Sequence, residues 1–250
     1  MPDLTVIVLT KNEERNIAAC LDSVRWADRL MVLDSFSDDH TVDIAEAAGA
    51  AVYRRPFVNY PDQRNAALDL ATTEWVFFVD ADERATPELG AEIRQAIASD
   101  RAGWWVPRRN IIWGKWIRHT GWYPDYQLRL LRRGRARYDP QREVHELVIL
   151  DGPAGYLQNP LIHYNYQTVG QFLARQDRYT HFEADILFKQ GIRPRPHNYI
   201  LQPLREFTRR FIALEGYRDG GYGFLLSLLM AYYTFLTYVR LRQRWRKQGG

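Results

Sequence analysis

The chain has 250 residues, of which 46% are apolar and 26% charged, a composition typical of a globular protein with one large domain or a domain with an extension. Its single cysteine, Cys20, excludes an internal disulfide and fits a reducing compartment. The formal charge of +4 is modest, but Arg and Lys are more concentrated in the C-terminal half. The first residues carry no basic n-region, so we expect no signal peptide.

The first hundred residues predict an alternation of strands and helices. Four short runs are rich in β-branched and large apolar residues, and each is followed by a segment with helical spacing or capping residues, such as Asn12 as an N-cap. This alternation implies a parallel sheet with right-handed crossovers and helices on both faces. The expected strands are 4–9, 29–34, 50–53 and 75–79, and the expected helices are 12–24, 42–48, 61–71 and 87–98.

Three of these strands end in polar or acidic residues. Thr10 and Asn12 follow the first strand, Asp34 ends the second, and Asp80 and Asp82 follow the run 75–79. Because ligands bind at the carboxyl ends of strands in open α/β sheets, we expect these side chains to converge on one crevice. Two carboxylates one residue apart can hold Mg²⁺ or Mn²⁺, and the metal can hold a diphosphate. Taken alone, the Asp-x-Asp pattern also fits two solvated acids in a loop.

The sequence changes character after residue 103, which we interpret as a mixed half with an acceptor subsite. The segment 108–122 mixes Trp, Arg, Lys and His, as a loop facing a polar ligand would. Residues 220–239 carry no charge, and a basic run from Arg240 to Lys247 follows them. Short strands are expected at 103–107, 127–132, 144–149 and 161–164, and helices at 170–190 and 199–214.

These motifs together resemble glycosyltransferase family 2 with the GT-A fold, a Rossmann-like and mostly parallel sheet with helices on both faces. The resemblance is carried by Thr10-Lys11-Asn12-Glu13, by Leu33-Asp34-Ser35 up to Thr41, by Gln63-Arg64-Asn65 and by Val79-Asp80-Ala81-Asp82-Glu83. One departure is the turn Asp38-Asp39-His40-Thr41, where the family more often has Gly before the Thr. Later segments, Gly121-Trp122-Tyr123-Pro124-Asp125 and Val144-His145-Glu146 among them, resemble the branch of bacterial lipopolysaccharide and lipooligosaccharide core β-1,4-glucosyltransferases.

The resemblance implies a nucleotide-diphosphate sugar, UDP-glucose or a similar donor, and a Mg²⁺ or Mn²⁺ cofactor. Asp80 and Asp82 would bind the metal, which would neutralise charge on the departing diphosphate. Taken singly, each of these donor-side residues also fits a helix cap, a turn or a surface charge. The residues implied for the nucleotide sugar are Thr10, Asn12, Glu13, Asp34, Arg64 and Asp80.

An inverting transfer needs a general base that deprotonates the acceptor hydroxyl. Glu146 follows a strand-like segment in the acceptor half, as the base of the family does, and we favour it over Asp125 and Glu143. His145 and His163 are weaker candidates for a metal or phosphate ligand, because a single His is more often structural.

The acceptor is implied to be a glycolipid or an oligosaccharide of the cell envelope. Aromatic rings suit the C–H faces of sugars, and the interleaved Lys115, Arg118 and His119 suit an anionic acceptor. The alternative is an aromatic core with solvated charges. The residues assigned to acceptor binding are Trp116, Trp122, Tyr123 and Arg129.

We expect a GT-A catalytic domain at 1–168, divided into a nucleotide-sugar half at 1–100 and an acceptor half at 101–168. A helical, basic and hydrophobic extension at 169–250 would associate peripherally with the cytoplasmic face of the inner membrane. The uncharged stretch 220–239 is also long enough to cross a bilayer, or to serve as a core helix or a contact between copies in a homo-oligomer.

Other classes fit less well. A haloacid-dehalogenase-type phosphatase has Thr or Val at the position of Arg84. A sugar nucleotidyltransferase has a Gly-rich loop after its first strand, whereas the segment from Thr10 to Glu14 contains no Gly. A nucleic-acid-binding module leaves the converging acids unexplained, so we expect no nucleic-acid partner. Within the family, a polyprenyl phosphate is the alternative acceptor, which the hydrophobic tail could recruit.

Overall fold

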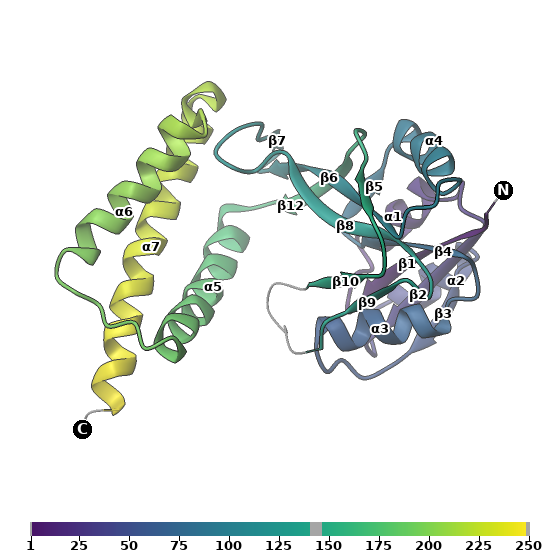
Figure 1. Ribbon diagram of the computed structural model, residues 1–250, viewed down its shortest axis with the longest axis horizontal. Coiled ribbons are helices and arrows are strands. Elements are labelled where there is room, and N and C mark those ends of the chain that lie inside the picture. Colours follow the sequence, from purple (N-terminus) through teal and green to yellow (C-terminus); the bar gives the residue numbers. More distant parts are fainter. Residues whose placement is uncertain (1, 141–146, 249–250) are drawn as a thin grey trace. The chain divides into compact units, whose positions relative to one another are not determined.

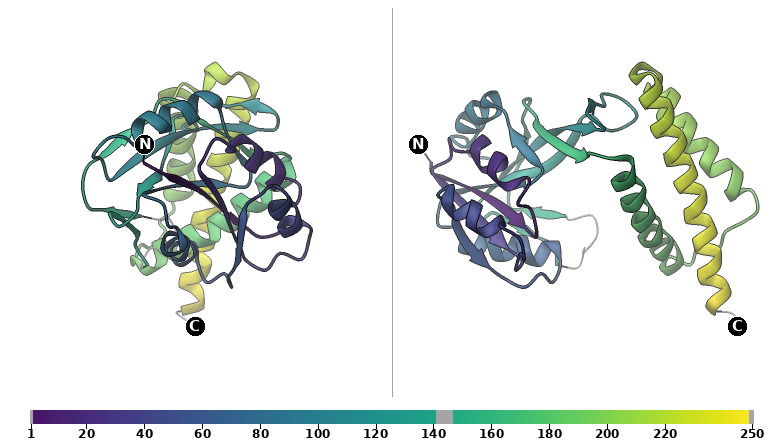
Figure 2. Two further views of the ribbon diagram at one scale, coloured as in Figure 1. Left: turned by 90° about the vertical axis from the view of Figure 1, so that its right-hand side faces the viewer. Right: turned by 180° about the vertical axis from the view of Figure 1, so that it is seen from behind.

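The computed structural model describes residues 2–140 and 147–248. By its internal contacts the chain divides into two compact units, which are drawn in Figures 1 and 2. The first unit combines Met1–Arg108 with Tyr126–His163, and the second combines Arg109–Asp125 with Tyr164–Gly250. Each unit is therefore built from two stretches that are separated in the sequence.

A parallel sheet of four strands forms the centre of the first unit. The strands lie in the order β3 (Ala51–Arg54), β2 (Arg29–Asp34), β1 (Leu4–Thr10) and β4 (Trp75–Asp80). In each of β1 and β4 all residues but one are buried, which explains why their sequences are almost continuously apolar. The four strands predicted from the sequence are confirmed.

Helices cover both faces of this sheet, as predicted. On one face, alternate residues such as Val6 and Val8 pack with α1 (Ile17–Ser23), α2 (Thr41–Ala47) and α4 (Pro87–Ala96). On the other face, Ile7 and Phe78 pack with α3 (Tyr60–Leu70). The two-residue period of a strand separates the apolar side chains between these two core layers.

An antiparallel part extends the sheet beyond β4 and confirms the predicted GT-A fold with its mixed half. Strand β8 (Asp125–Arg132) pairs antiparallel with β4, and the order continues through β6 (Gly103–Ile112), β12 (Leu161–Tyr166) and β5 (Glu83–Ala85). The remaining short strands are β7 (Lys115–Trp116), β9 (Ala136–Tyr138), β10 (Val148–Leu150) and β11 (Ala154–Tyr156).

The structure differs from the prediction in three segments. Asn12 is not an N-cap, because it adopts a positive φ of 57° and its N–H donates to Ser37 Oγ, so that α1 begins only at Ile17. The predicted loop 108–122 begins as strand, because β6 runs to Ile112 and pairs with β7. Of the strand predicted at 144–149, only Val148 and Ile149 are found, in β10, and Glu143, His145 and Glu146 lie outside the described residues.

The second unit is mainly helical. Helix α7 (Gly221–Gln248) packs against both α5 (Val169–Lys189) and α6 (Asn198–Thr208), as Figure 1 shows. A π-helical turn at Arg209–Ala213 and a 3₁₀ turn at Gly216–Asp219 connect α6 to α7. Gly223 is required here, because a Cβ at this position would lie 1.8 Å from the carbonyl oxygen of Gly216. The apolar core of the unit comprises Ile112, Ile117, Tyr166, Phe172, Leu226 and Tyr233.

Candidate active site

The carboxyl ends of β1, β2 and β4 lie at one edge of the sheet in the first unit. The strand register places Asp34 opposite Thr10 and Asp80 opposite Leu9. Thr10 Oγ1 donates to Asp34 Oδ1 at 2.9 Å, and both residues are buried. The N–H of Ser37 donates to Asp34 Oδ2 at 2.8 Å. The predicted convergence of polar strand ends is therefore present in the fold.

Asn12 and Glu13 belong to the same hydrogen-bonded edge. Asn12 Oδ1 accepts from the N–H of Asp38 at 2.9 Å, which closes the turn after β1 onto the turn after β2. Burial raises the pKa of Glu13, and the charges of Asp82, Asp39 and Asp80 add to that effect although Asn16 donates to its carboxylate. A carboxylate held at a raised pKa beside other acids is typical of a ligand-binding site.

Two arginines from different elements enclose Asp80. Arg64, on α3, donates to Asp80 Oδ1 at 3.2 Å, and Arg129, on β8, donates to the same oxygen at 3.1 Å and also to Oδ2. Burial would raise the pKa of Asp80, but the charges of Arg129, Arg64 and Arg108 outweigh it and hold that pKa far below its usual range. Asp80 is thus a fixed negative charge that balances two buried cations. The structure places Arg129, predicted to bind the acceptor, on this carboxylate.

The turn between β4 and β5 is fixed by a buried carboxylate. Glu83 Oε2 accepts from the N–H of Asp80 at 2.9 Å, and Arg108 Nη1 lies 3.5 Å from Glu83 Oε1. Sequence reasoning missed Arg108, since it stands among other arginines in a segment that was interpreted as a loop. Glu83 is fully buried and therefore holds the Asp-x-Asp turn in place.

Asp82 has a histidine beside it. His163 Nε2, on β12, lies 3.4 Å from Asp82 Oδ2, and the antiparallel pairing of β12 with β5 sets His163 opposite Glu83. The His163 side chain is 7% exposed and that of Asp82 is 25% exposed. An oxygen and an imidazole nitrogen this close can bind one divalent ion. Among the described residues there is no group of three or more His, Cys, Asp or Glu that could hold a metal ion.

Three of the four residues predicted to bind the acceptor, Trp116, Trp122 and Tyr123, belong to the second unit, whereas Arg129 belongs to the first. The Trp116 and Tyr123 rings meet edge to face at 5.4 Å between centroids, and Trp122 makes a similar contact with Tyr166 at 6.2 Å. Asp125 Oδ2 accepts from the buried Asn110 side chain at 3.2 Å. The assignment of these residues to the acceptor stays a prediction, as does the choice of base between Asp125 and the undescribed Glu143 and Glu146.

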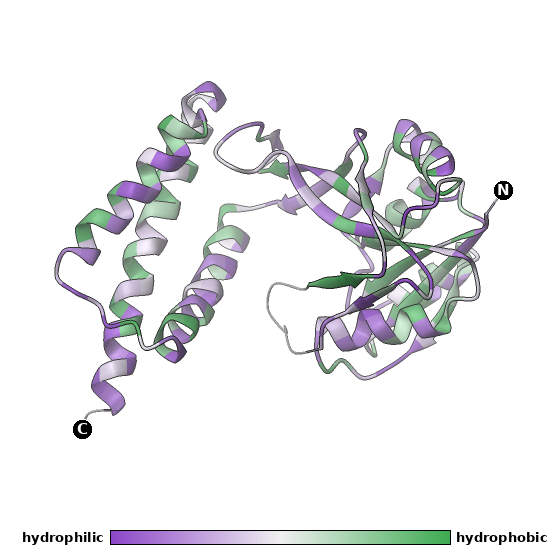
Figure 3. Ribbon diagram, in the orientation of Figure 1, coloured by the Kyte–Doolittle hydropathy of each residue, from purple (hydrophilic) through white to green (hydrophobic). Residues whose placement is uncertain are grey.

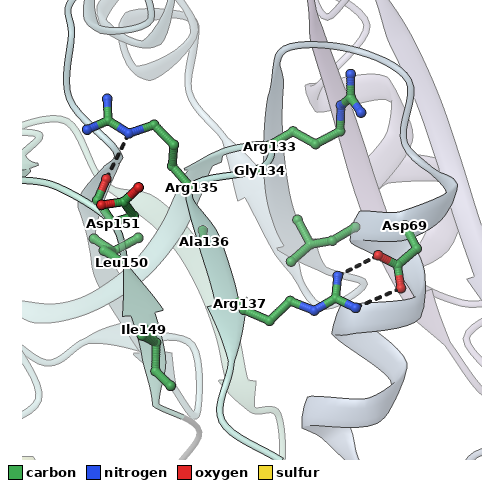
Figure 4. Close-up of a pocket in the computed structure, with 10 residues that line it drawn as sticks. Asp69, Arg133, Gly134, Arg135, Ala136, Arg137, Ile149, Leu150 and Asp151 are labelled. Atoms are coloured by element: carbon green, nitrogen blue, oxygen red, sulfur yellow. Dashed lines mark hydrogen bonds and ion pairs between the residues drawn. The ribbon is translucent and has the colours of Figure 1, made fainter.

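A cavity of about 610 Å³ lies elsewhere in the first unit and is not a candidate active site. Its lining includes three arginines, and Figure 4 shows the partners of two of them, Arg135 and Arg137. Arg137 is paired with Asp69, Arg135 donates to the carbonyl oxygen of Asp151, and Arg133 donates to carbonyl oxygens of Thr72 and Thr73. These donors are occupied by structural contacts and stabilise the turn around Gly134.

Comparison with known proteins gives a consistent result. The model of the family described as "Glycosyl transferase family 2" matches residues 5–164. A "Lipopolysaccharide core biosynthesis glycosyltransferase LpsC" from Rhizobium meliloti (strain 1021) is 28% identical over 249 residues, which cover 96% of this chain and 92% of that protein. An "Uncharacterized glycosyltransferase" from Rickettsia bellii (strain RML369-C) is 26% identical over 253 residues, covering 96% of this chain and 86% of that protein.

Solved structures are similar over a smaller part of the chain. Glucosyl-3-phosphoglycerate synthase from Mycobacterium tuberculosis, solved with Mn²⁺, UDP-glucose and phosphoglyceric acid, matches with a TM-score of 0.39 and 23% identity. The match covers 43% of this chain and 44% of that chain.

Proposed function

Since the chain belongs to glycosyl transferase family 2, we propose that it is a metal-dependent, inverting enzyme that transfers glucose from UDP-glucose to a hydroxyl of a lipopolysaccharide core glycolipid. Glycosyl transfer follows from family membership, whereas the donor, the metal, the stereochemistry and the acceptor are the proposal. The observation that supports it most is the sheet edge where Asp34, the Asp80–arginine cluster and the Asp82–His163 pair lie together.

The nucleoside would bind where β1 and β2 end. The buried Asp34 carboxylate and the turn at Asn12 and Glu13 offer oxygen acceptors for a uracil N–H and for ribose hydroxyls. These groups are held by hydrogen bonds to one another before any ligand arrives, which lowers the entropy cost of binding. We assign uridine recognition to Thr10, Asn12, Glu13 and Asp34.

The diphosphate would bind beside Asp82 and His163. A divalent ion held by these two side chains and by phosphate oxygens would act as a Lewis acid for the departing UDP. Arg64 and Arg129, fixed by Asp80, add positive charge on the same side. Asp80 thereby acts chiefly by orienting two cations, and Asp82 is the aspartate that we assign to the metal.

Proton removal would fall to the acceptor side. A carboxylate takes the proton of the acceptor hydroxyl, and that oxygen attacks the anomeric carbon from the face opposite UDP while the bond to the phosphate oxygen breaks. We keep Glu146 as the base. Asp125, which Asn110 holds in place, is the alternative.

The acceptor and the location are supported by the relative from Rhizobium meliloti and by the helices of the second unit. The printed name of that relative assigns it to lipopolysaccharide core biosynthesis. Residues 190–250 contain eleven Arg and Lys against three Asp and Glu. Side chains of α6 such as Ile200, Leu201 and Leu204 are more than half exposed, and Figure 3 shows the hydrophobic stretches along α6 and α7. One described helix, α7, is long and apolar enough to cross a membrane, and 33% of its apolar stretch of 18 residues is buried.

Exposed apolar side chains beside an excess of positive charge complement an anionic bilayer surface. We therefore assign the face of α6 that carries Ile200, Leu201 and Leu204 to the cytoplasmic surface of the inner membrane. A second copy of the chain is the alternative occupant that an experiment must distinguish.

UDP release from a panel of UDP-sugars, with and without Mg²⁺ or Mn²⁺, tests the donor and the metal. We expect metal-dependent release from UDP-glucose that requires a lipopolysaccharide core acceptor for full rate and that Asp82→Ala abolishes. Glu146→Gln should lower kcat by about 100-fold or more, the usual contribution of a general base. Asp69→Asn, which breaks an exposed pair with Arg137, is the matched control. Full transfer activity in Asp82→Ala would refute the metal assignment.

A further inference from the structure

Two arginines lie over the ring of Trp116. The guanidinium carbon of Arg109, on β6, is 4.2 Å from the centre of the ring, and that of Arg118, which follows β7, is 4.1 Å from it. Tyr123 closes the edge of the same ring. All four residues belong to the stretch Arg109–Asp125 of the second unit.

This arrangement brings two like charges close together. Each guanidinium lies about 4 Å from one ring centre, so the two are no more than about 8 Å apart, where like charges repel each other. Within residues 2–140 and 147–248, no carboxylate forms an ion pair with either arginine. Arg210 in the same unit, by contrast, is neutralised by Glu206. The positive charge of the Arg109–Arg118 pair is therefore not neutralised by any described side chain.

The contact with the Trp116 ring does not use the hydrogen-bond donors of the two guanidinium groups. A cation–π contact uses the face of the guanidinium, whereas hydrogen bonds use the N–H groups in its plane. Arg109 Nε is buried and has no hydrogen-bond partner among the described residues, which is costly for a polar atom. Arg118 is exposed, so its donors can be reached from solvent. A planar fork of N–H donors suits the oxygens of a phosphate or a carboxylate.

The backbone around Arg118 is held in place from outside the stretch. Asp219 is 4% exposed, and its carboxylate accepts from the N–H of Arg118 at 3.3 Å and from that of His119 at 2.8 Å. Lys115 Nζ donates to the carbonyl oxygen of Asp219 at 2.9 Å. The position of Arg118 is thus fixed by the second unit before any ligand binds.

We infer that Arg109 and Arg118, supported by Trp116, form a subsite for an oxyanion, either a phosphate or a carboxylate, that the acceptor carries. This inference rests on the proposed function, since it takes the bound molecule to be the acceptor. Trp116 then serves as the platform of the two cations, and acceptor choice depends on the charge of the acceptor as well as on its sugar.

Phosphate binding can be tested without any transfer reaction. The indole N–H signal of Trp116 is identified in a ¹H–¹⁵N spectrum by its loss in Trp116→Phe, and it is followed while inorganic phosphate or, separately, acetate is added at constant ionic strength with NaCl. We expect a saturable shift with at least one of the two that Arg109→Gln/Arg118→Gln removes. Arg193→Gln, which removes an arginine that lies 4.7 Å over Trp245, should leave the shift unchanged. A response equal to that of NaCl for both anions overturns the subsite.

The source of the anion is tested by comparing acceptors. A phosphorylated core oligosaccharide and the same oligosaccharide after phosphatase treatment are compared by their KM, with the KM of UDP-glucose as the internal reference. We expect the Arg109→Gln and Arg118→Gln variants to raise the KM of the phosphorylated acceptor by about 10-fold to 100-fold and to lose the preference for it. Arg118→Lys should recover only part of the preference, because lysine lacks the planar fork.

Two outcomes would contradict the inference, and neither coincides with failure of the proposed function. If wild-type protein transfers glucose and the arginine variants keep its acceptor preference, the subsite is wrong although the function holds. If vesicles of phosphatidylglycerol shift the Trp116 signal and neither soluble anion does, the cations bind lipid headgroups and the acceptor assignment is overturned. Absence of transfer by the wild-type protein refutes the proposed function and with it the acceptor as the ligand, whereas the phosphate and acetate titrations still decide whether the anion subsite exists.

Discussion

Asp80 and its two arginines behave as one electrostatic group. Arg64 and Arg129 are almost fully buried, and a buried cation is stable only when a carboxylate compensates it. The pKa of Asp80 lies far below its usual range, so its stabilising effect is present above the ordinary aspartate pKa and is lost only when the pH falls through the depressed value. The cluster therefore stays charged at every pH at which the protein would work.

We predict opposite phenotypes for the two aspartates of the Asp-x-Asp turn. Asp80→Asn leaves two cations uncompensated and should cost about 3 kcal/mol in the free energy of unfolding, or roughly 6–12 °C in Tm, with a similar loss at pH 5 and pH 8. Asp82→Asn keeps the arginine cluster and should change Tm by no more than about 2 °C while abolishing metal-dependent UDP release. Thermal unfolding of both variants at the two pH values measures the difference, and equal stability losses would contradict it.

Part of the site could be predicted from the sequence and part could not. Thr10, Asp34 and Asp80 stand directly after continuously apolar runs, so their convergence follows from the parallel topology. Arg129 and His163 reach the same edge from antiparallel strands that lie far along the chain, and no local pattern indicates that pairing. The position of Glu146 lies outside the described residues, so its assignment still depends on the resemblance alone.

At the scale of elements, the sequence predicts a strand clearly when both faces of that strand are buried, and poorly when only one face is buried. β1 and β4 are buried on both faces and their sequences predict strands clearly. β6 contains both buried and half-buried residues up to Ile112, and its arginines are typical of a loop. At Asn12 the backbone N–H donates to Ser37 Oγ and the side-chain Oδ1 accepts from the N–H of Asp38, an arrangement that no helix-start rule anticipates.

Helix α6 gives the prediction that belongs to this scale. Ile200→Gln with Leu204→Gln should lower binding to vesicles of phosphatidylglycerol at least about tenfold, because each apolar side chain contributes roughly 1.5–3 kcal/mol when it is buried. Their stability effect should be small, since both side chains are more than half exposed in the fold. Vesicle flotation measures the binding, and Ile149→Gln, an exposed apolar residue of the first unit, is the control.

The same variants distinguish a membrane from a second copy. If the protein sediments as a dimer without lipid and the α6 variant sediments as a monomer, α6 is a contact between copies and the membrane assignment is wrong. If the wild-type protein and the α6 variant both sediment as monomers and NaCl weakens vesicle binding, the results agree with binding of α6 to an anionic membrane surface.

At the scale of the whole molecule, the chain does not divide at one point. The stretch Arg109–Asp125 belongs to the same unit as the C-terminal helices, and contacts such as that between Asp219 and His119 join residues about one hundred positions apart. Sequence patterns are local, so they indicated an extension after residue 168 without showing that an earlier stretch is part of its core. The grouping only becomes visible in three dimensions.

Removal of residues 169–250 should therefore destabilise what remains. Ile112, Ile117 and Tyr166 would lose Phe172, Leu226 and Tyr233, which line the same apolar core. Three lost contacts of this size cost several kcal/mol, a large part of the stability of an ordinary domain. We expect the shortened chain to aggregate in gel filtration, whereas removal of residues 246–250 should be tolerated. A soluble, monodisperse chain of residues 1–168 would contradict this prediction.

The anchoring of Arg118 and His119 by Asp219 has a consequence for how such enzymes diverge and can be recombined. A chimera can take residues 109–125 from one relative and the C-terminal helices from another. It then separates the N–H donors of Arg118 and His119 from the Asp219 carboxylate that accepts their hydrogen bonds. If residues 109–125 select the acceptor as proposed, exchange of acceptor preference between relatives should require both stretches to be inherited together, while the Asp-x-Asp turn and the sheet edge at Asp34 can stay with the recipient.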